Sequence, residues 1–157
     1  MVRNIGRGLA KAAPEAAASC PATADAYATR LEALGGRFAA VGAHAARKNV
    51  IALHDGMAYL LRDAGLNLVA VIQEDEEAQP SAARLLELVH TIKKTGPVAL
   101  VSEPQYSDKP VRTLSAETGV PVVQLDPLAS GPTDAPLEYY ETVMDNNCRI
   151  LGNYFDK

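Results

Sequence analysis

Four short apolar runs occur in the middle and second half of the chain, and each is continuous rather than alternating between apolar and polar residues. They cover residues 49–54, 67–72, 97–102 and 121–126. Continuous apolar runs of this length are typical of strands that helices cover on both faces. We therefore predict four buried strands at these positions.

The segments between these runs have the residue spacing of helices. Ser81 is a suitable N-cap for a helix that ends at Gly96. Asp108 is a suitable cap for a second helix that ends at Gly119, and Asp55 for a short helix after the first strand. Alternation of strands and helices predicts a parallel sheet with right-handed crossovers. The expected fold class is therefore α/β, with a four-stranded parallel sheet and helices on both faces.

Two longer helical patterns flank the predicted sheet. Residues 23–46 place apolar side chains at three- and four-residue spacing, so one face of this helix is apolar. Gly35 and Gly36 lie in its middle, where each costs roughly 1 kcal/mol relative to alanine, and we expect a kink or a break there. Residues 134–155 predict a closing helix. The apolar side of that helix is expected to comprise Leu137, Tyr140, Val143, Met144, Ile150 and Leu151.

Composition supports a packed core and excludes several classes of protein. Of the 157 residues, 48% are hydrophobic and 22% are charged, which argues against a disordered chain. The net charge of −4 argues against binding to nucleic acid, which needs clustered lysine and arginine. We recognise neither a membrane span nor a secretory signal. The pairing of Cys20 with Cys148 stays open.

Groups that can bind a metal or catalyse a reaction follow three of the four predicted strands. His54 and Asp55 end the first strand, Glu103 follows the third, and Asp126 ends the fourth. In open parallel sheets, ligands bind beyond the carboxyl ends of the strands. Imidazole and carboxylate groups are suitable ligands for Zn²⁺. The alternative is structural, with both aspartates capping helices or turns and the histidine satisfied within the core.

An enzyme is the less favoured interpretation of the same strand-end residues. His54, Asp55 and Glu103 have the chemistry of an acid–base group. However, neither a nucleophile elbow, nor a phosphate-binding glycine loop, nor a Cys–His arrangement accompanies them. The other two histidines, His44 and His90, fit solvated or half-buried positions on helices. We therefore expect a binding protein rather than an enzyme.

Several of these residues occur in the order of a known family pattern. Residues 50–59 (VIALHDGMAY) read as a strand, a His-Asp pair and a helix with a tyrosine. Residues 103–106 (EPQY) match a Glu-Pro-Gln-aromatic turn, residues 125–128 (LDPL) match the turn after the fourth strand, and residues 140–147 match the closing helix. With these motifs the chain resembles the zinc-type periplasmic solute-binding proteins of ABC transporters, from about residue 5 to residue 151.

The resemblance implies a division of the chain and a set of metal ligands. In that family, two α/β lobes joined by a long rigid helix hold the metal between them. Residues 1–47 would then be a helical segment that includes the linking helix, and residues 48–157 the C-terminal metal-binding lobe, with the N-terminal lobe missing. The two ligands of that lobe correspond to His54 and Asp126. Glu103 would be an outer residue that orients a ligand.

The resemblance also implies a metal, a location and partners. A histidine ligand at position 54 favours zinc over manganese, in line with ligand softness. The parent family binds zinc in the periplasm for high-affinity uptake and delivers it to an ABC-transporter permease.

One histidine and one aspartate do not fill a four-coordinate zinc site. We therefore expect a homodimer through the face that would meet the other lobe, in which two copies share a site. The alternative to a function in zinc uptake is a binding or dimerisation module that has kept the fold and lost metal transport.

Overall fold

The computed structural model describes residues 1–73 and 79–155 of the chain. The chain divides into two compact units, Met1–Arg37 and Phe38–Lys157. The boundary lies inside one long helix, α2 (Ser19–His44). Our division at residue 47, where the helical segment gives way to the predicted lobe, stays a prediction.

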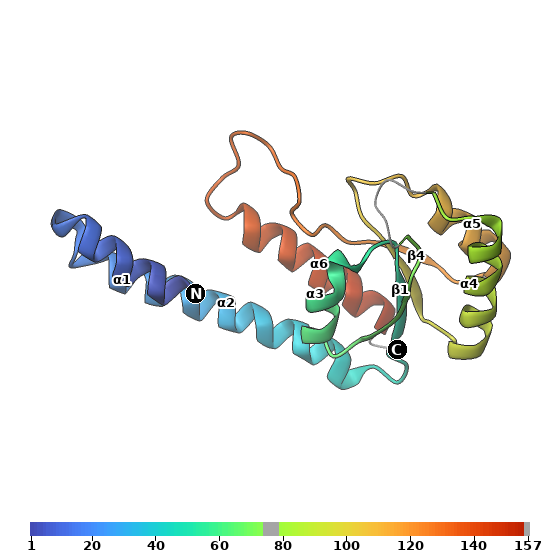
Figure 1. Ribbon diagram of the computed structural model, residues 1–157. Coiled ribbons are helices and arrows are strands. Elements are labelled where there is room, and N and C mark those ends of the chain that lie inside the picture. The colour runs from blue at the N-terminus through green and yellow to red at the C-terminus, as the bar shows by residue number, and fades with distance from the viewer. Residues whose placement is uncertain (74–78, 156–157) are drawn as a thin grey trace. The chain divides into compact units, whose positions relative to one another are not determined.

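The first unit pairs two helices. The 3-10 turn η1 (Pro14–Ala16) connects α1 (Val2–Ala12) to α2, and Figure 1 shows α1 folded back along the start of α2. Gly6 allows the two helices to approach closely, because a Cβ at this position would overlap the Cβ of Ala24.

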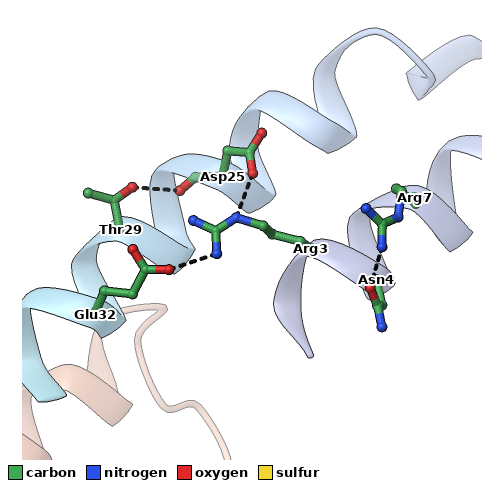
Figure 2. Close-up of polar contacts among 6 residues, drawn as sticks. All are labelled: Arg3, Asn4, Arg7, Asp25, Thr29 and Glu32. Atoms are coloured by element: carbon green, nitrogen blue, oxygen red, sulfur yellow. Dashed lines mark hydrogen bonds and ion pairs between the residues drawn. The ribbon is translucent and has the colours of Figure 1, made fainter.

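One arginine joins the two helices of this unit through their polar side chains. Figure 2 shows Arg3 of α1 reaching two carboxylates of α2, with Nε donating to Asp25 Oδ1 at 2.9 Å and Nη1 donating to Glu32 Oε1 at 2.7 Å. The hydrogen bond from Arg3 lowers the pKa of Glu32 below its usual value. All three side chains are exposed, so water and salt screen the pair and its contribution to stability is small.

The second unit contains a four-stranded parallel sheet. Its strands are β1 (Asn49–Ala52), β2 (Asn67–Val71), β3 (Ala99–Ser102) and β4 (Val122–Gln124), in the order β2-β1-β3-β4. Each strand lies within the apolar run that predicted it, and all three pairings are parallel, which confirms the predicted fold class. From β1 the chain adds β2 on one side and then β3 on the other, so a topological switch point lies between β1 and β3.

Helices cover both faces of the sheet, as Figure 1 shows. α4 (Ala82–Thr95) and α5 (Lys109–Thr118) lie on one face, and α3 (Ala58–Asp63) and α6 (Tyr139–Phe155) on the other. The core beneath α4 and α5 consists of Ile51, Leu53, Ile72, Leu88, Ile92, Leu100, Val111 and Leu114. Burial on both faces explains why the strand sequences are continuously apolar.

The ends of α4 and α5 follow three of the predicted signals. The hydroxyl of Ser81 caps α4 by accepting a hydrogen bond from the amide of Arg84 at 3.1 Å. Gly96 and Gly119 end α4 and α5 in the left-handed region, with φ of 55° and 72°. Glycine reaches this region without the steric penalty of a Cβ, so these local signals were sufficient.

Two predicted caps are wrong. The carboxylate of Asp108 accepts a hydrogen bond from the side chain of Arg112 at 2.6 Å and makes no capping hydrogen bond to a backbone amide of α5. Asp55 is the exposed first residue of η2 (Asp55–Met57), a 3-10 turn that leads into α3. Asp108 does stand at the N-cap position of α5, but its carboxylate is bound to Arg112 instead of a backbone amide, whereas Asp55 lies inside the 3-10 turn, one residue after its N-cap His54.

The two flanking helices also differ from the expectation. α2 continues through Gly35 and Gly36 as one helix, so the chain does not break there, and a kink at these glycines stays a prediction. α6 begins only at Tyr139. Leu137 precedes it and is 95% exposed, and Tyr140 is 45% exposed, so neither belongs to the buried face. Pro136 explains part of this later start, because proline disfavours helical geometry at the residue before it, here Ala135.

Within residues 1–73 and 79–155, none of the helices is both long and apolar enough to span a membrane. Cys20 and Cys148 form no disulfide in this part of the chain.

Candidate metal centre

His54 lies just beyond β1, at the carboxyl edge of the sheet. The pairing with β3 continues one residue past the strand, where the amide of Leu53 donates to the carbonyl of Val101 at 2.8 Å. His54 itself is extended, with φ of −128° and ψ of 172°, and only 5% exposed. Nothing in the described part of the chain forms a hydrogen bond with its Nε2 atom. Burying a polar atom in this way costs about 1–3 kcal/mol unless a ligand supplies the missing interaction.

The imidazole of His54 packs against the phenol ring of Tyr106. The ring centroids are 4.3 Å apart and the ring planes are tilted by 53°. Tyr106 lies in the turn after β3, where its amide donates to the carbonyl of Glu103 at 3.3 Å. The residues were predicted as a turn motif, but Tyr106 was given no role; the ring contact limits how the imidazole can rotate.

Glu103 occupies on β3 the level that His54 occupies on β1. Ala52 of β1 pairs with Val101 of β3, and each of the two site residues follows two positions later. Glu103 is 2% exposed, and its Oε2 accepts a hydrogen bond from Gln105 Nε2 at 2.8 Å. Register therefore brings a buried carboxylate and a buried imidazole to neighbouring strand ends.

Asp126 lies two residues beyond β4 and is half-buried. Its Oδ1 accepts a hydrogen bond from the amide of Leu128 at 2.7 Å, which closes an Asx turn. Leu128 has a φ of 61°, the left-handed region that residues with a Cβ seldom adopt. The backbone of Asp126 is bound on both its donor and its acceptor by the side chain of Asn147.

The strand order separates the two predicted ligands. His54 and Glu103 follow adjacent strands, whereas β3 lies between β1 and β4, the strand that leads to Asp126. Two interstrand spacings of roughly 4.8 Å put the backbones of β1 and β4 about 10 Å apart. Among the residues that the structure describes, there is no group of three or more His, Cys, Asp or Glu side chains that could hold a metal ion. Asp55 is exposed at the start of η2 and joins no such group.

A cavity of about 440 Å³ opens beside Asp126, between β4 and α6. Its lining includes Pro104, Gln124, Asp126, Asn147, Ile150 and Tyr154. Solvent therefore has access to the neighbourhood of the aspartate.

Asn147 is a functional candidate that our sequence reasoning missed. It lies three residues after Met144 and four before Leu151, so it interrupts the buried stripe of α6. A polar side chain on a buried helical stripe needs hydrogen-bond partners. That position was the available signal, but no local pattern indicated which residue Asn147 would bind.

Relatives of this chain include proteins that are named for zinc. The zinc-binding protein AdcA of Streptococcus pyogenes serotype M1 is 33% identical over 154 residues, which cover 96% of this chain and 30% of AdcA. The high-affinity zinc uptake system protein ZnuA of Brucella suis biovar 1 is 31% identical over 161 residues, which cover 100% of this chain and 47% of ZnuA. The chain therefore spans less than half the length of these curated relatives.

Solved structures share the fold. The solute-binding protein FpvC of Pseudomonas aeruginosa, in complex with Mn²⁺, matches with a TM-score of 0.81 and 30% identity, over 98% of this chain and 57% of FpvC. A mutant of the laminin-binding adhesin Lmb of Streptococcus agalactiae matches with a TM-score of 0.82 over 97% of this chain and 57% of Lmb. At 23% identity, the second likeness concerns the fold alone.

The family match extends over nearly the whole chain. The model of the family described as zinc-uptake complex component A, periplasmic, matches residues 1–153. Together with the parallel sheet and the strand-end residues, this match shows that the chain belongs to the ZnuA family of zinc-uptake components.

Proposed function

We propose that the chain binds Zn²⁺ as the cargo of metal uptake, with His54 and Asp126 as ligands. The observation that carries this proposal is the buried Nε2 atom of His54, which forms no hydrogen bond within the described part of the chain. It lies at the carboxyl end of β1, beside the switch point where open α/β sheets bind ligands. A metal ion would supply the missing partner.

The chemistry of the two donors suits zinc. An imidazole nitrogen and a carboxylate oxygen bind Zn²⁺ at roughly 2.0–2.2 Å, and imidazole is a softer donor than the oxygen ligands that manganese prefers. The relatives AdcA and ZnuA are described by zinc, whereas FpvC has been solved with Mn²⁺ and with Ni²⁺. Because proteins of this fold bind several metals, we assign the selectivity for zinc to the ligand atoms of His54 and Asp126 rather than to the fold.

Glu103 supports the site rather than coordinating the metal in this proposal. One of its carboxylate oxygens already accepts the hydrogen bond from Gln105. Glu103 is buried at the level of His54 on the neighbouring strand. This position suits a carboxylate that does not bind the metal but orients a metal ligand and adds negative charge beside it.

Donors from outside this half-site complete the coordination shell. A zinc site holds four ligands, of which His54 and Asp126 supply two. We propose a two-fold homodimer in which a second copy supplies the same pair of ligands. In such a dimer the same surface of both copies forms the interface, so the two half-sites face each other. Water is the alternative, and it predicts weaker binding by each chain alone.

The proposed role is delivery of zinc to an ABC-transporter permease on the outer side of the cytoplasmic membrane. The family description includes the word periplasmic, and a relative from Streptococcus pneumoniae is described as a zinc-binding lipoprotein. The second candidate is a module that kept the fold and lost transport. In that case, His54→Ala would leave the binding of its protein partner unchanged.

The test is a zinc titration of the metal-free chain against a competing chromophoric chelator, read as affinity and as zinc per chain. A Kd below about 1 µM, near −8 kcal/mol, with one zinc per two chains supports a site shared by two copies. A Kd above about 10 µM, near −7 kcal/mol, with one zinc per chain supports a half-site completed by water. Binding that survives both His54→Ala and Asp126→Ala contradicts the ligand assignment.

A further inference from the structure

Asn147 ties the closing helix to the residue after the fourth strand. Its side chain is 1% exposed, and it makes two hydrogen bonds to the backbone of a single residue. The amide of Asp126 donates to Asn147 Oδ1 at 3.0 Å, and Asn147 Nδ2 donates to the carbonyl of Asp126 at 2.8 Å. The two bonds hold both polar backbone groups of the proposed ligand from one side.

The two hydrogen bonds with Asn147 take the place of the backbone pairing that Asp126 would have inside a strand. The hydrogen bond from the amide of Leu125 to the carbonyl of Ser102, at 3.0 Å, continues the pairing of β3 and β4 one residue beyond β4. Asp126 is the next residue, where its backbone groups still need partners because they are only partly accessible to water. A carboxamide offers a donor and an acceptor side by side, which neither a carboxylate nor an aliphatic side chain provides.

A second contact restrains the carboxylate itself. The amide of Leu128 donates to Asp126 Oδ1, and Leu128 keeps a φ of 61° in doing so. Unfavourable backbone geometry of this kind persists where surrounding contacts enforce it. The backbone of Asp126 is thus fixed by Asn147 and its Oδ1 by Leu128, which leaves Oδ2 as the oxygen that we assign to the metal.

We propose that Asn147 is a positioning residue for zinc coordination: its buried carboxamide sets the place of Asp126 before the metal arrives. The inference rests on the proposed function, since it requires Asp126 to be a ligand. A ligand that is already in place loses less conformational freedom when the metal binds, so affinity rises. Removing such an outer contact typically lowers metal affinity by about 10–100-fold.

The experiment compares four variants of the full chain by chelator competition with Zn²⁺, at a temperature where circular dichroism shows each to be folded. They are Asn147→Ala, Asp126→Ala, the double variant, and the control Asn153→Ala, which changes an exposed amide on the same helix. The absorption spectrum of bound Co²⁺ reports the geometry of the ligands independently of affinity. Asn147→Ser provides a milder change if the alanine variant does not fold.

We expect Asn147→Ala to weaken zinc binding by about 10-fold or more and to alter the Co²⁺ spectrum, with Asn153→Ala unchanged. In the Asp126→Ala background the same substitution should have no further effect on affinity, because the residue it positions is gone. A purely structural role would lower the unfolding temperature in both backgrounds and leave the affinity of the folded protein unchanged.

Two results would overturn parts of the proposal separately. If Asp126→Ala weakens zinc binding while Asn147→Ala and Asn147→Ser retain the parent affinity, the positioning role is wrong and the proposed function stands. If Asp126→Ala itself retains the parent affinity, the assignment of Asp126 as a ligand fails, and the role of Asn147 fails with it.

Discussion

The ring of His54 packs on the ring of Tyr106, with centroids 4.3 Å apart. The two residues follow β1 and β3, the strands that border the switch point of the sheet. Their contact therefore forms only once those strands have paired. The proposed zinc ligand is held by a partner that is close in the sheet and distant in the chain.

Loss of this ring contact should weaken zinc binding without abolishing it. Tyr106→Leu removes an aromatic contact worth about 0.5–1.5 kcal/mol and frees the imidazole to rotate. We expect an affinity loss of about 10-fold, and a smaller loss for Tyr106→Phe, which keeps the ring. Chelator competition measures both, with the exposed Tyr59→Leu as control. Equal affinities for all variants would remove Tyr106 from the site.

Zinc should raise the unfolding temperature of the parent protein through His54. Free zinc at 100 times its Kd stabilises a folded protein by about 2.7 kcal/mol. Removal of a ligand in His54→Ala should abolish this rise, whereas His90→Ala, an exposed histidine of α4, should retain it. Differential scanning calorimetry with and without zinc gives the comparison. A rise of equal size in His54→Ala would contradict the assignment.

Two glycines of α2 should respond to alanine in opposite directions. A Cβ on Gly42 would overlap the carbonyl oxygen of Ala64 and the Cα of Gly65, so the backbone of that turn would have to move. We expect Gly42→Ala to lower the free energy of unfolding by about 1–3 kcal/mol.

The matched substitution is Gly36→Ala in the same helix, where a Cβ would have no atom within 4 Å. We expect it to raise the free energy of unfolding by up to about 1 kcal/mol, because alanine has the higher helix propensity. Urea unfolding measures both changes. A Gly42→Ala variant as stable as the parent would show that the helix and the turn do not approach closely.

The pair of Arg3 and Glu32 should give the first unit a small pH dependence. The hydrogen bond from Arg3 lowers the pKa of Glu32 in the folded protein. A carboxyl group with a lowered pKa stabilises the fold above its unfolded pKa, and this contribution disappears as the pH falls through the folded value.

NMR titration of the Glu32 carboxyl group tests this directly. In Arg3→Gln, we expect the pKa of Glu32 to rise toward its usual value, because the donor and the positive charge are both lost. High salt should raise the pKa of Glu32 in the parent and have less effect in the variant, since the pair is exposed. An unchanged pKa in Arg3→Gln would contradict the contact that Figure 2 shows.

Local patterns were sufficient for the elements of the fold. Strands such as β1 and β3 lie inside the predicted apolar runs, and Ser81 and Gly96 bound α4 as predicted. Burial on two faces and the geometry of a helix end both depend on a few neighbouring residues, so the sequence carries them directly. The failures were also local, as at Asp108, where a side-chain ion pair replaced the expected cap.

The candidate site was also predicted only in part. The chemistry of His54, Glu103 and Asp126 was visible in the sequence because each lies at the end of a predicted strand or just beyond it, and the roles assigned to them stay predictions. The sequence did not provide the strand order, the ring contact of His54, or the hydrogen bonds from Asn147 to Asp126.

The sequence by itself determined where the four strands and the helices α4 and α5 lie and which family the chain resembles. The tertiary structure alone decided that β3 separates the strands leading to His54 and Asp126, and that α6 supplies the amide that holds the aspartate. The physical reason is that these relationships join residues far apart in the chain. They depend on the order in which strands pair and on which helix covers which face, and neither is encoded in a local pattern of apolar and polar residues.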